Sequence, residues 1–347
     1  MFEGKGISRH HRQLVGLMIV LICWLPYSLF AQSLDFPTRH SGISFGNSKY
    51  FSGIRFNFRD HDVERISGMN FTLWKGYDNE RARITGIAAG VIPEGGYLSG
   101  VQLGIAGVAA DRQLKGIGIG MLGVGSGGSI TGIALGGLGV GAGESMQGVF
   151  IGGLGVGSGG DITGISIGGL GVGAGINLTG LNIGFLGAGA GENMTGLNFG
   201  GLGVGAGKNL TGLNVGGLGA GAGEKVTGIN LALLGVGAGE ALTGITIAGL
   251  GAGAPEVQGF TIAGFAVGGN KITGVSAALG TVRIRGDGEY TGIMASAFNY
   301  IKGKQTGISL GIVNYAFQLK GVQIGLINYV RDNPVFLKVL PIINANF

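Results

Sequence analysis

The chain of 347 residues contains 80 Gly and only 6 Pro, with 12% charged residues and a formal net charge of +5. Glycine does not recur every third residue and proline is scarce, which excludes a collagen triple helix. The mean hydropathy of +0.44 argues against a disordered chain, because disordered segments are polar and strongly charged. A helical globule is also excluded, since each glycine inside a helix costs about 1 kcal/mol relative to alanine.

Residues 1–31 have the features of an export signal, which is removed from the mature protein. Three basic residues precede the apolar run 14–30, and Leu29-Phe30-Ala31 fits a cleavage site before Gln32. A membrane anchor is the alternative, but an apolar core of about 17 residues is at the short limit for a spanning helix. Cys23 is the single cysteine and lies inside this run, so the mature chain has neither disulfides nor thiolate metal sites.

A sixteen-residue repeat fills most of the mature chain. A glycine that follows Thr or Gln and precedes an apolar residue recurs every sixteen residues from Gly132 to Gly244, and the unit 196–211 reads GLNFGGLGVGAGKNLT. Exact repeats cover about 116–258 and degenerate repeats lie on both sides, so 32–347 is predicted to be one repetitive domain of about twenty units. The repeat glycines are Gly42, Gly53, Gly68, Gly86, Gly100, Gly116, Gly132, Gly148, Gly164, Gly180, Gly196, Gly212, Gly228, Gly244, Gly259, Gly274, Gly292, Gly307 and Gly321.

Within a unit, numbered from its repeat glycine, apolar residues stand at positions 2, 4, 7, 9 and 11, and this spacing of two indicates β-strand. The parity changes at the Gly216-Gly217 pair, so we expect a corner or a bulge there. Positions 13–16 carry nearly all the charge and are predicted to be the turn. Apolar residues such as Leu218 are expected to face a core or lipid, and Asn214 to lie on the opposite, wet face.

Two architectures fit this repeat. In a β-solenoid each unit is one coil, the apolar positions fill a narrow core, and Asn182, Asn198, Asn214 and Asn230 stack in a ladder. A strict period without insertions favours this arrangement. In a closed antiparallel outer-membrane β-barrel each unit is one strand and one turn, and about ten residues per strand and about twenty strands both lie in the barrel range.

The flanks of the repeat array favour the barrel. Residues 51–59 alternate as a full amphipathic strand without a glycine corner. Tyr300, Tyr315 and Tyr329 occupy the same position in three successive units, as an interfacial aromatic girdle would. We therefore expect the all-β chain to form a barrel, with a β-solenoid or open repeat sheet as the alternative.

The terminal strand 335–347 alternates apolar residues and ends on Phe347. An export signal followed by such a strand resembles the assembly signal of bacterial outer-membrane barrels. The resemblance implies that Phe347, Ile343 and Val339 are recognised by the barrel-assembly machinery and that outer-membrane lipid is the other partner. Pro341 departs from the pattern, because a proline removes a ladder hydrogen bond.

The GLxIGxLxVGAG units and the tail GVQIGLINY…NP…VLPIIN are similar to those of glycine-rich surface-repeat proteins of Gram-negative bacteria. The resemblance spans most of the mature chain. It implies a location in the outer membrane or at the cell surface, and it implies no activity.

No residues suited to catalysis cluster in the sequence. The mature chain contains only His40 and His61, and His61 stands among Asp60, Asp62 and Glu64. A metal or acid–base cluster is one interpretation of this segment, but we expect a solvated loop. We therefore predict no catalytic, cofactor-binding or metal site, and no enzyme.

The predicted function is an exported cell-envelope β-repeat protein, either a membrane-embedded structural protein or a passive pore. The alternative is a surface-exposed or secreted solenoid for adhesion or partner binding. Without residues 1–31 the net charge is +3, which gives no reason to expect nucleic acid as a partner. The sequence names no small-molecule ligand.

Overall fold

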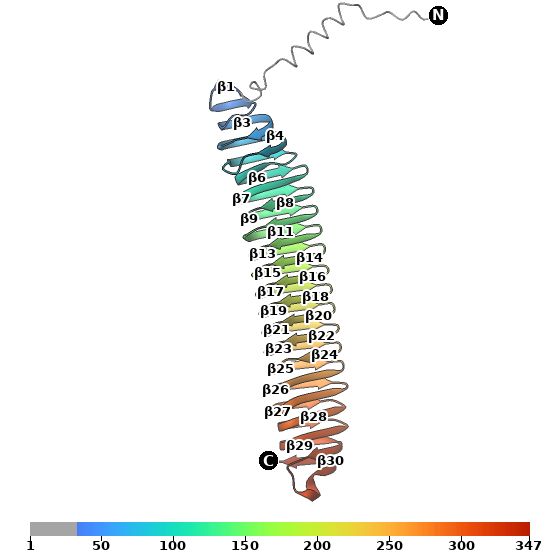
Figure 1. Ribbon diagram of the computed structural model, residues 1–347. Helices are drawn as coiled ribbons and strands as arrows, with labels where there is room; N and C mark the ends of the chain where they lie inside the picture. Colours follow the sequence, from blue (N-terminus) through green and yellow to red (C-terminus); the bar gives the residue numbers. More distant parts are fainter. Residues whose placement is uncertain (1–32) are drawn as a thin grey trace, which may run out of the picture.

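The computed structural model describes residues 33–347, which form one rod of stacked turns (Figure 1). The chain runs along the rod from the N-terminal to the C-terminal end, and its strands belong to one continuous hydrogen-bonded sheet. Each strand of the regular region pairs in parallel with the equivalent strands of the neighbouring turns, as in Asn193↔Asn209. Neighbouring strands of a bacterial outer-membrane barrel are antiparallel. The structure is therefore the expected alternative, a β-solenoid, and not the closed antiparallel barrel.

One regular turn contains a long and a short strand joined by two corners. In the representative turn, β17 (Asn193–Gly200) is followed by a corner at 201–202, β18 (Gly203–Ala206) and a second corner at 207–208. The other long strands are β9 (Ser129–Gly136), β11 (Ser145–Gly152), β13 (Asp161–Gly168), β15 (Asn177–Gly184), β19 (Asn209–Gly216), β21 (Lys225–Ala232), β23 (Ala241–Ala248) and β25 (Glu256–Ala263). The other short strands are β8 (Gly123–Ser126), β10 (Gly139–Ala142), β12 (Gly155–Ser158), β14 (Gly171–Ala174), β16 (Gly187–Ala190), β20 (Gly219–Ala222), β22 (Gly235–Ala238) and β24 (Gly251–Gly253).

The strict period of the repeat follows from hydrogen bonding at the corners as well as in the strands. The corner amide of Leu202 donates to the carbonyl of Leu186 at 2.6 Å, and Leu218 donates in turn to Leu202 at 2.7 Å. An inserted residue would leave such groups unpaired, which is costly where water is excluded. Positions 13–16 were expected to form the turn; only 12 and 13 make the corner, and 14–16 already begin the next long strand.

All nineteen repeat glycines predicted from the sequence stack in one column, and all have positive φ values, between +106° and +137°. Gly196 pairs with Gly180 on one side and with Gly212 on the other. A Cβ on Gly196 would lie 2.2 Å from the carbonyl oxygen of Gly180. Glycine is required here for two reasons, because this backbone conformation disfavours L side chains and the next turn leaves no room for one.

The core is built from positions 3, 9, 11 and 15, which corrects the expected face assignment. Asn198, Val204, Ala206 and Leu210 are the buried residues of one turn at these positions. Positions 9 and 11 were correctly expected to face the core. Positions 2, 4 and 7 lie on the outside. The alternation of side chains between the two faces of the long strand continues through the repeat glycine, which keeps positions 2 and 4 on the outer face. The corner that contains position 7 then reverses the chain before the short strand.

Asn182, Asn198, Asn214 and Asn230 form the ladder expected of a solenoid, but inside the core. The side-chain amides of Asn182, Asn198 and Asn214 each donate to the amide oxygen of the next asparagine, at 2.8, 2.9 and 2.8 Å, and all four residues are 0% exposed. Stacked amides satisfy one another, which lowers the cost of burying them. The expectation that Asn214 faces water was therefore wrong, and so was the expectation that Leu218 is buried, since it is 46% exposed.

Wider turns and antiparallel caps complete the rod. At the N-terminal end β1 (Leu34–Thr38) pairs antiparallel with β2 (Ser41–Phe45), and at the C-terminal end β30 (Val339–Asn346) pairs antiparallel with β29 (Val313–Val330). Both cap strands carry a proline, which an edge strand accepts and which hinders pairing with a further strand. The remaining elements are β3 (Tyr50–His61), β4 (Arg65–Tyr77), β5 (Arg83–Gly90), β6 (Glu94–Gly104), β7 (Gly107–Gly120), β26 (Ala266–Ala278), β27 (Thr281–Ala295), β28 (Phe298–Leu310) and η2 (Val335–Leu337).

Candidate interaction surface

Three rows of apolar side chains line the outside of the regular turns. Positions 2 and 4 project from the outer face of the long strands, and position 7 projects from the corner that follows. The nine leucines of position 7 are between 46 and 57% exposed. We call these rows the apolar flank. It comprises Ile117, Ile133, Val149, Ile165, Leu181, Leu197, Leu213, Ile229, Ile245 and Phe260 at position 2; Ile119, Leu135, Ile151, Ile167, Ile183, Phe199, Val215, Leu231, Ile247 and Ile262 at position 4; and Leu122, Leu138, Leu154, Leu170, Leu186, Leu202, Leu218, Leu234, Leu250 and Phe265 at position 7.

The other half of the same strand face is polar. Position 16, two residues before the flank begins, carries only Thr or Gln from Thr131 to Thr273. At position 14 the amide of Asn193 donates to Asn177 at 2.9 Å, and Asn209 donates to Asn193 at 2.9 Å. The rod is therefore amphipathic along its length, with a sharp boundary at the repeat glycine.

The rows of the flank run straight along the rod. Figure 1 shows the long strands on one side and the short strands on the other over the whole regular region. Equivalent residues of successive turns lie about 4.8 Å apart, the spacing of hydrogen-bonded strands. Because the sides of the rod do not exchange places, the flank is one continuous strip and not a set of separate patches.

A bare strip of glycines lies next to the leucines of position 7. Positions 8 and 10 of the short strands are Gly in every turn from Gly123 to Gly253. At position 10 of this turn the fold does not require glycine: a Cβ on Gly205 would lie 3.8 Å from its nearest neighbour, and in the same row β28 carries Tyr300. Leu122, Gly123 and neighbouring residues line a shallow hollow of about 390 Å³, which places the leucines at the rim of the bare strip.

The segment around His61 contains a buried charge network and not the expected solvated loop. Asp60 and Arg55 are both buried and pair at 2.6 Å. The other Asp60 carboxylate oxygen accepts hydrogen bonds from Asn70 and Thr72, each at 2.9 Å. The Asp60 carboxylate is thus occupied on both oxygens and has a structural role. His61 stacks on Tyr77 at the surface, and no cluster of metal-ligating side chains occurs within 33–347.

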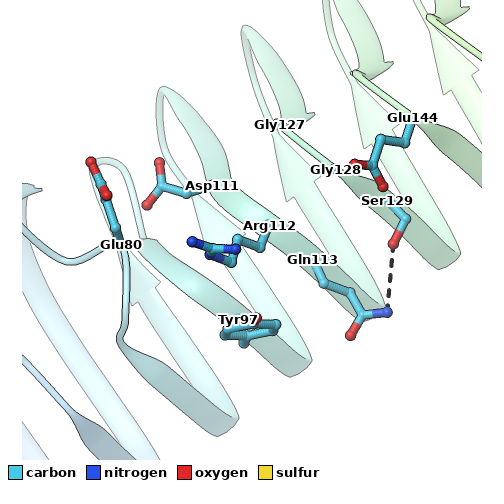
Figure 2. A pocket seen from close by; sticks show the side chains of 9 residues that line it. All are labelled: Glu80, Tyr97, Asp111, Arg112, Gln113, Gly127, Gly128, Ser129 and Glu144. Atoms are coloured by element: carbon cyan, nitrogen blue, oxygen red, sulfur yellow. Dashed lines mark hydrogen bonds between the residues drawn. The ribbon is translucent and has the colours of Figure 1, made fainter.

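A polar hollow of about 570 Å³ lies along the charged side of the rod, from Glu80 in the loop before β5 to Glu144 in the corner before β11 (Figure 2). Glu80, Asp111 and Glu144 are spread along it, and Arg112 projects beside Asp111. Burial raises the pKa of Asp111, and the nearby charge of Glu80 raises it further. The hollow is open, and its three carboxylates come from every second turn along this side of the rod. It has the character of a charged surface and lacks a nucleophile paired with a base.

The tyrosines predicted to share one position do so. Tyr300 stacks on Tyr315 with ring centroids 4.8 Å apart, and Tyr315 stacks on Tyr329 at 5.2 Å. Arg283 lies over the Tyr300 ring, 5.6 Å from its centroid. This column continues the row of position 10, so it follows the bare glycine strip and lies apart from the apolar flank. The proposed role of these residues as a membrane girdle remains a prediction.

The segment that resembled a barrel-assembly signal is the C-terminal cap. The strand predicted over 335–347 begins only at Val339, because Val335–Leu337 form a short 3-10 helix. Val339 and Ile343 both pair with β29, and Phe347 is 92% exposed at the end of the chain. A barrel closes by pairing its last strand with its first. In this solenoid the last strand closes one end of the stack and does not pair with the first. The departure at Pro341 has a physical reason here, because β30 is an edge strand. The predicted export signal, 1–31, lies outside the described residues.

No helix within 33–347 is long and apolar enough to cross a membrane. The chain matches no family model, no curated protein and no solved structure. The surface itself therefore supplies the argument about function. The apolar positions 2, 4 and 7 are the sequence signal of the flank, and the prediction that they face a core or lipid is wrong for the core, because they lie on the outside.

Proposed function

We propose that this protein is an exported, non-enzymatic rod of the cell envelope that binds a partner along its apolar flank. This function corresponds to the alternative that the sequence offers, a surface-exposed solenoid for adhesion or partner binding. It replaces the membrane-embedded structural protein or pore as our preferred function. The observation that carries it is the unbroken flank, in which ten successive turns place only apolar residues at positions 2, 4 and 7 on the outside.

The size of the flank supports a binding role. A half-exposed leucine leaves on the order of 75 Å² of apolar surface in water, so the nine leucines of position 7 leave about 700 Å². The largest apolar patch on a typical monomer is about 300–600 Å². Positions 2 and 4 add twenty partly exposed residues to the same strip, so the flank is well above what a protein without a partner exposes.

The rigidity of the rod supports a structural role. Every turn is hydrogen-bonded to both neighbours through strands and corners, and the two ends are capped. Such an array holds its rows in fixed relative positions over a length of roughly 85 Å, from eighteen spacings of about 4.8 Å between the repeat glycines. A partner with regularly spaced apolar groups would meet many identical contacts at once.

Site-specific photo-crosslinking in cells tests this proposal. The full chain, including 1–31, is produced with a photoreactive side chain at Leu202 of the flank or at Thr195 of the polar row in the same turn. We expect a defined covalent adduct from Leu202 and none from Thr195, in envelope-associated protein whose N-terminus is Gln32. A chain that stays in the cytoplasm, or equal crosslinking from both positions, would contradict the proposal.

A further inference from the structure

We infer that the partner of the apolar flank is a second copy of this chain, which lays its own flank against the first. The inference rests on the proposed function, since it names the occupant of the same surface. The area of the flank, the shape of its rows and the charge of the turns that carry it all favour such a partner.

The area of the flank suffices for a stable dimer. A standard protein interface buries about 800 Å² on each partner. The leucines of position 7 alone leave about 700 Å² exposed, and the twenty residues of positions 2 and 4 at least as much again. Covering this strip needs a partner as long as the rod itself, and a second copy has that length by construction.

The shape of the flank suits another sheet. Side chains at positions 2 and 4 stand on one strand face in straight rows, and the rows of two such faces interdigitate when sheets pack about 10 Å apart. A two-fold dimer uses the same patch on both subunits, so a uniform strip meets an identical strip without any further sequence requirement. The bare glycine strip beside the leucines leaves space for the leucines of the opposite copy at the rim of the contact.

The charge and composition of the same turns favour protein over lipid. Between 116 and 270 there are six acidic residues and two lysines, with neither Arg, Trp nor Tyr. Elements that lie on membranes carry basic residues for anionic lipids and Trp or Tyr at the interface. The acidic corner would instead be repelled by an anionic membrane surface. Both lysines lie next to a glutamate, Lys208 at 2.9 Å from Glu192 and Lys225 at 3.9 Å from Glu240.

Light scattering coupled to size-exclusion chromatography tests the inference on the exported protein, produced from the full chain. The flank variant replaces Leu170, Leu186, Leu202 and Leu218 by Gln. The matched control replaces Thr163, Thr179, Thr195 and Thr211 by Gln, a residue that the polar row already contains at Gln147. We expect a dimer mass for the wild type and the control. The flank variant should be a folded monomer, with a dimer dissociation constant raised at least about 100-fold.

A second measurement separates this inference from the proposed function. Flotation with phosphatidylcholine vesicles reports lipid binding by the same three proteins. A monomeric wild type that floats, with a flank variant that does not, would overturn the dimer and leave the flank as a binding surface. A monomer that neither floats nor crosslinks from Leu202 would overturn both. A flank variant that still dimerises would show that another surface joins the copies.

Discussion

Two glycines of one repeat unit, Gly196 and Gly205, should respond in opposite ways to replacement by alanine. Gly196 has φ of +120°, and a Cβ there would lie 2.2 Å from the carbonyl oxygen of Gly180. Gly205 lacks a positive φ, and its Cβ would have its nearest neighbour at 3.8 Å. The two sites share the same turn and the same chemical change, so each serves as the control for the other.

The magnitudes follow from these geometries. An L residue in a sparsely populated backbone region costs about 1–3 kcal/mol. Forcing an extra carbon into a packed space costs about another 1–3 kcal/mol. We therefore expect Gly196→Ala to destabilise the rod locally by about 4 kcal/mol. Gly205→Ala should stabilise it by about 0.5–1 kcal/mol, because alanine loses less conformational entropy on folding than glycine.

The assay must be local, because long repeat arrays need not unfold in one step. Amide hydrogen exchange read separately over β17 and over the distant β9 provides this resolution. Gly196→Ala should speed exchange in β17 and its neighbours and leave β9 unchanged, while Gly205→Ala should slow it or leave it unchanged. If both variants protect β17 equally, the argument that stacking demands a glycine at the repeat position is refuted.

Three further predictions concern the core. Asn214→Arg should destabilise by about 4 kcal/mol or more, because it puts a charge into the buried amide ladder, whereas Leu218→Arg on the exposed flank should cost less than about 1 kcal/mol. Thermal unfolding of the two variants measures this difference. Burial raises the pKa of Tyr290 to about 12, so its share of stability is complete below about pH 10 and falls by about 2 kcal/mol as pH rises to 12. In Tyr290→Phe this part of the alkaline loss should be missing from denaturant titrations at pH 8 and pH 11.5. Arg55→Met should cost about 3–5 kcal/mol, because it leaves the Asp60 carboxylate buried without its cation, and limited proteolysis should then begin at β3.

The sequence predicted the positions of the repeat glycines, because their cause is local, whereas their parallel stacking was predicted only by the solenoid alternative. The repeat position combines a positive φ with a close backbone contact, and only glycine fits both. Because every turn has this requirement, the glycine recurs with the period of the turns and can be recognised in the sequence. The absence of insertions follows from corner hydrogen bonds such as Leu218 to Leu202. The all-β class, the single repetitive domain and the amide ladder all follow from this regularity.

The orientation of the rows was not predictable in the same way. Leu202 and Val204 are both apolar and stand two residues apart, yet the first is on the surface and the second in the core. Hydrophobicity patterns assign sides by assuming that apolar residues are buried, and an amphipathic rod with an apolar outer strip breaks that assumption. Asn198 is the opposite exception, a polar residue in the core, because its amide is hydrogen-bonded to the neighbouring turns and not to water.

The Arg55–Asp60 network was missed for a different reason. Its charged residues are close in sequence, as in an exposed loop, and a run of alternating charges usually indicates one. The partners that allow burial, Asn70 and Thr72, come from the following turn. A contact between turns in the irregular N-terminal region has no fixed sequence spacing, so no local sequence pattern predicts it.

Folding alone does not explain why the flank is apolar. The same outer strand face accepts Thr and Gln at position 16 throughout the regular turns, so polar side chains are compatible with the stack. Position 6 makes the point more sharply. It is Gly in most regular turns, and where it carries a side chain the residues are Met121, Phe185 and Leu233, which are 71, 67 and 71% exposed. All three side chains at this exposed position are apolar. This composition is typical of an interface and not of a surface exposed to water.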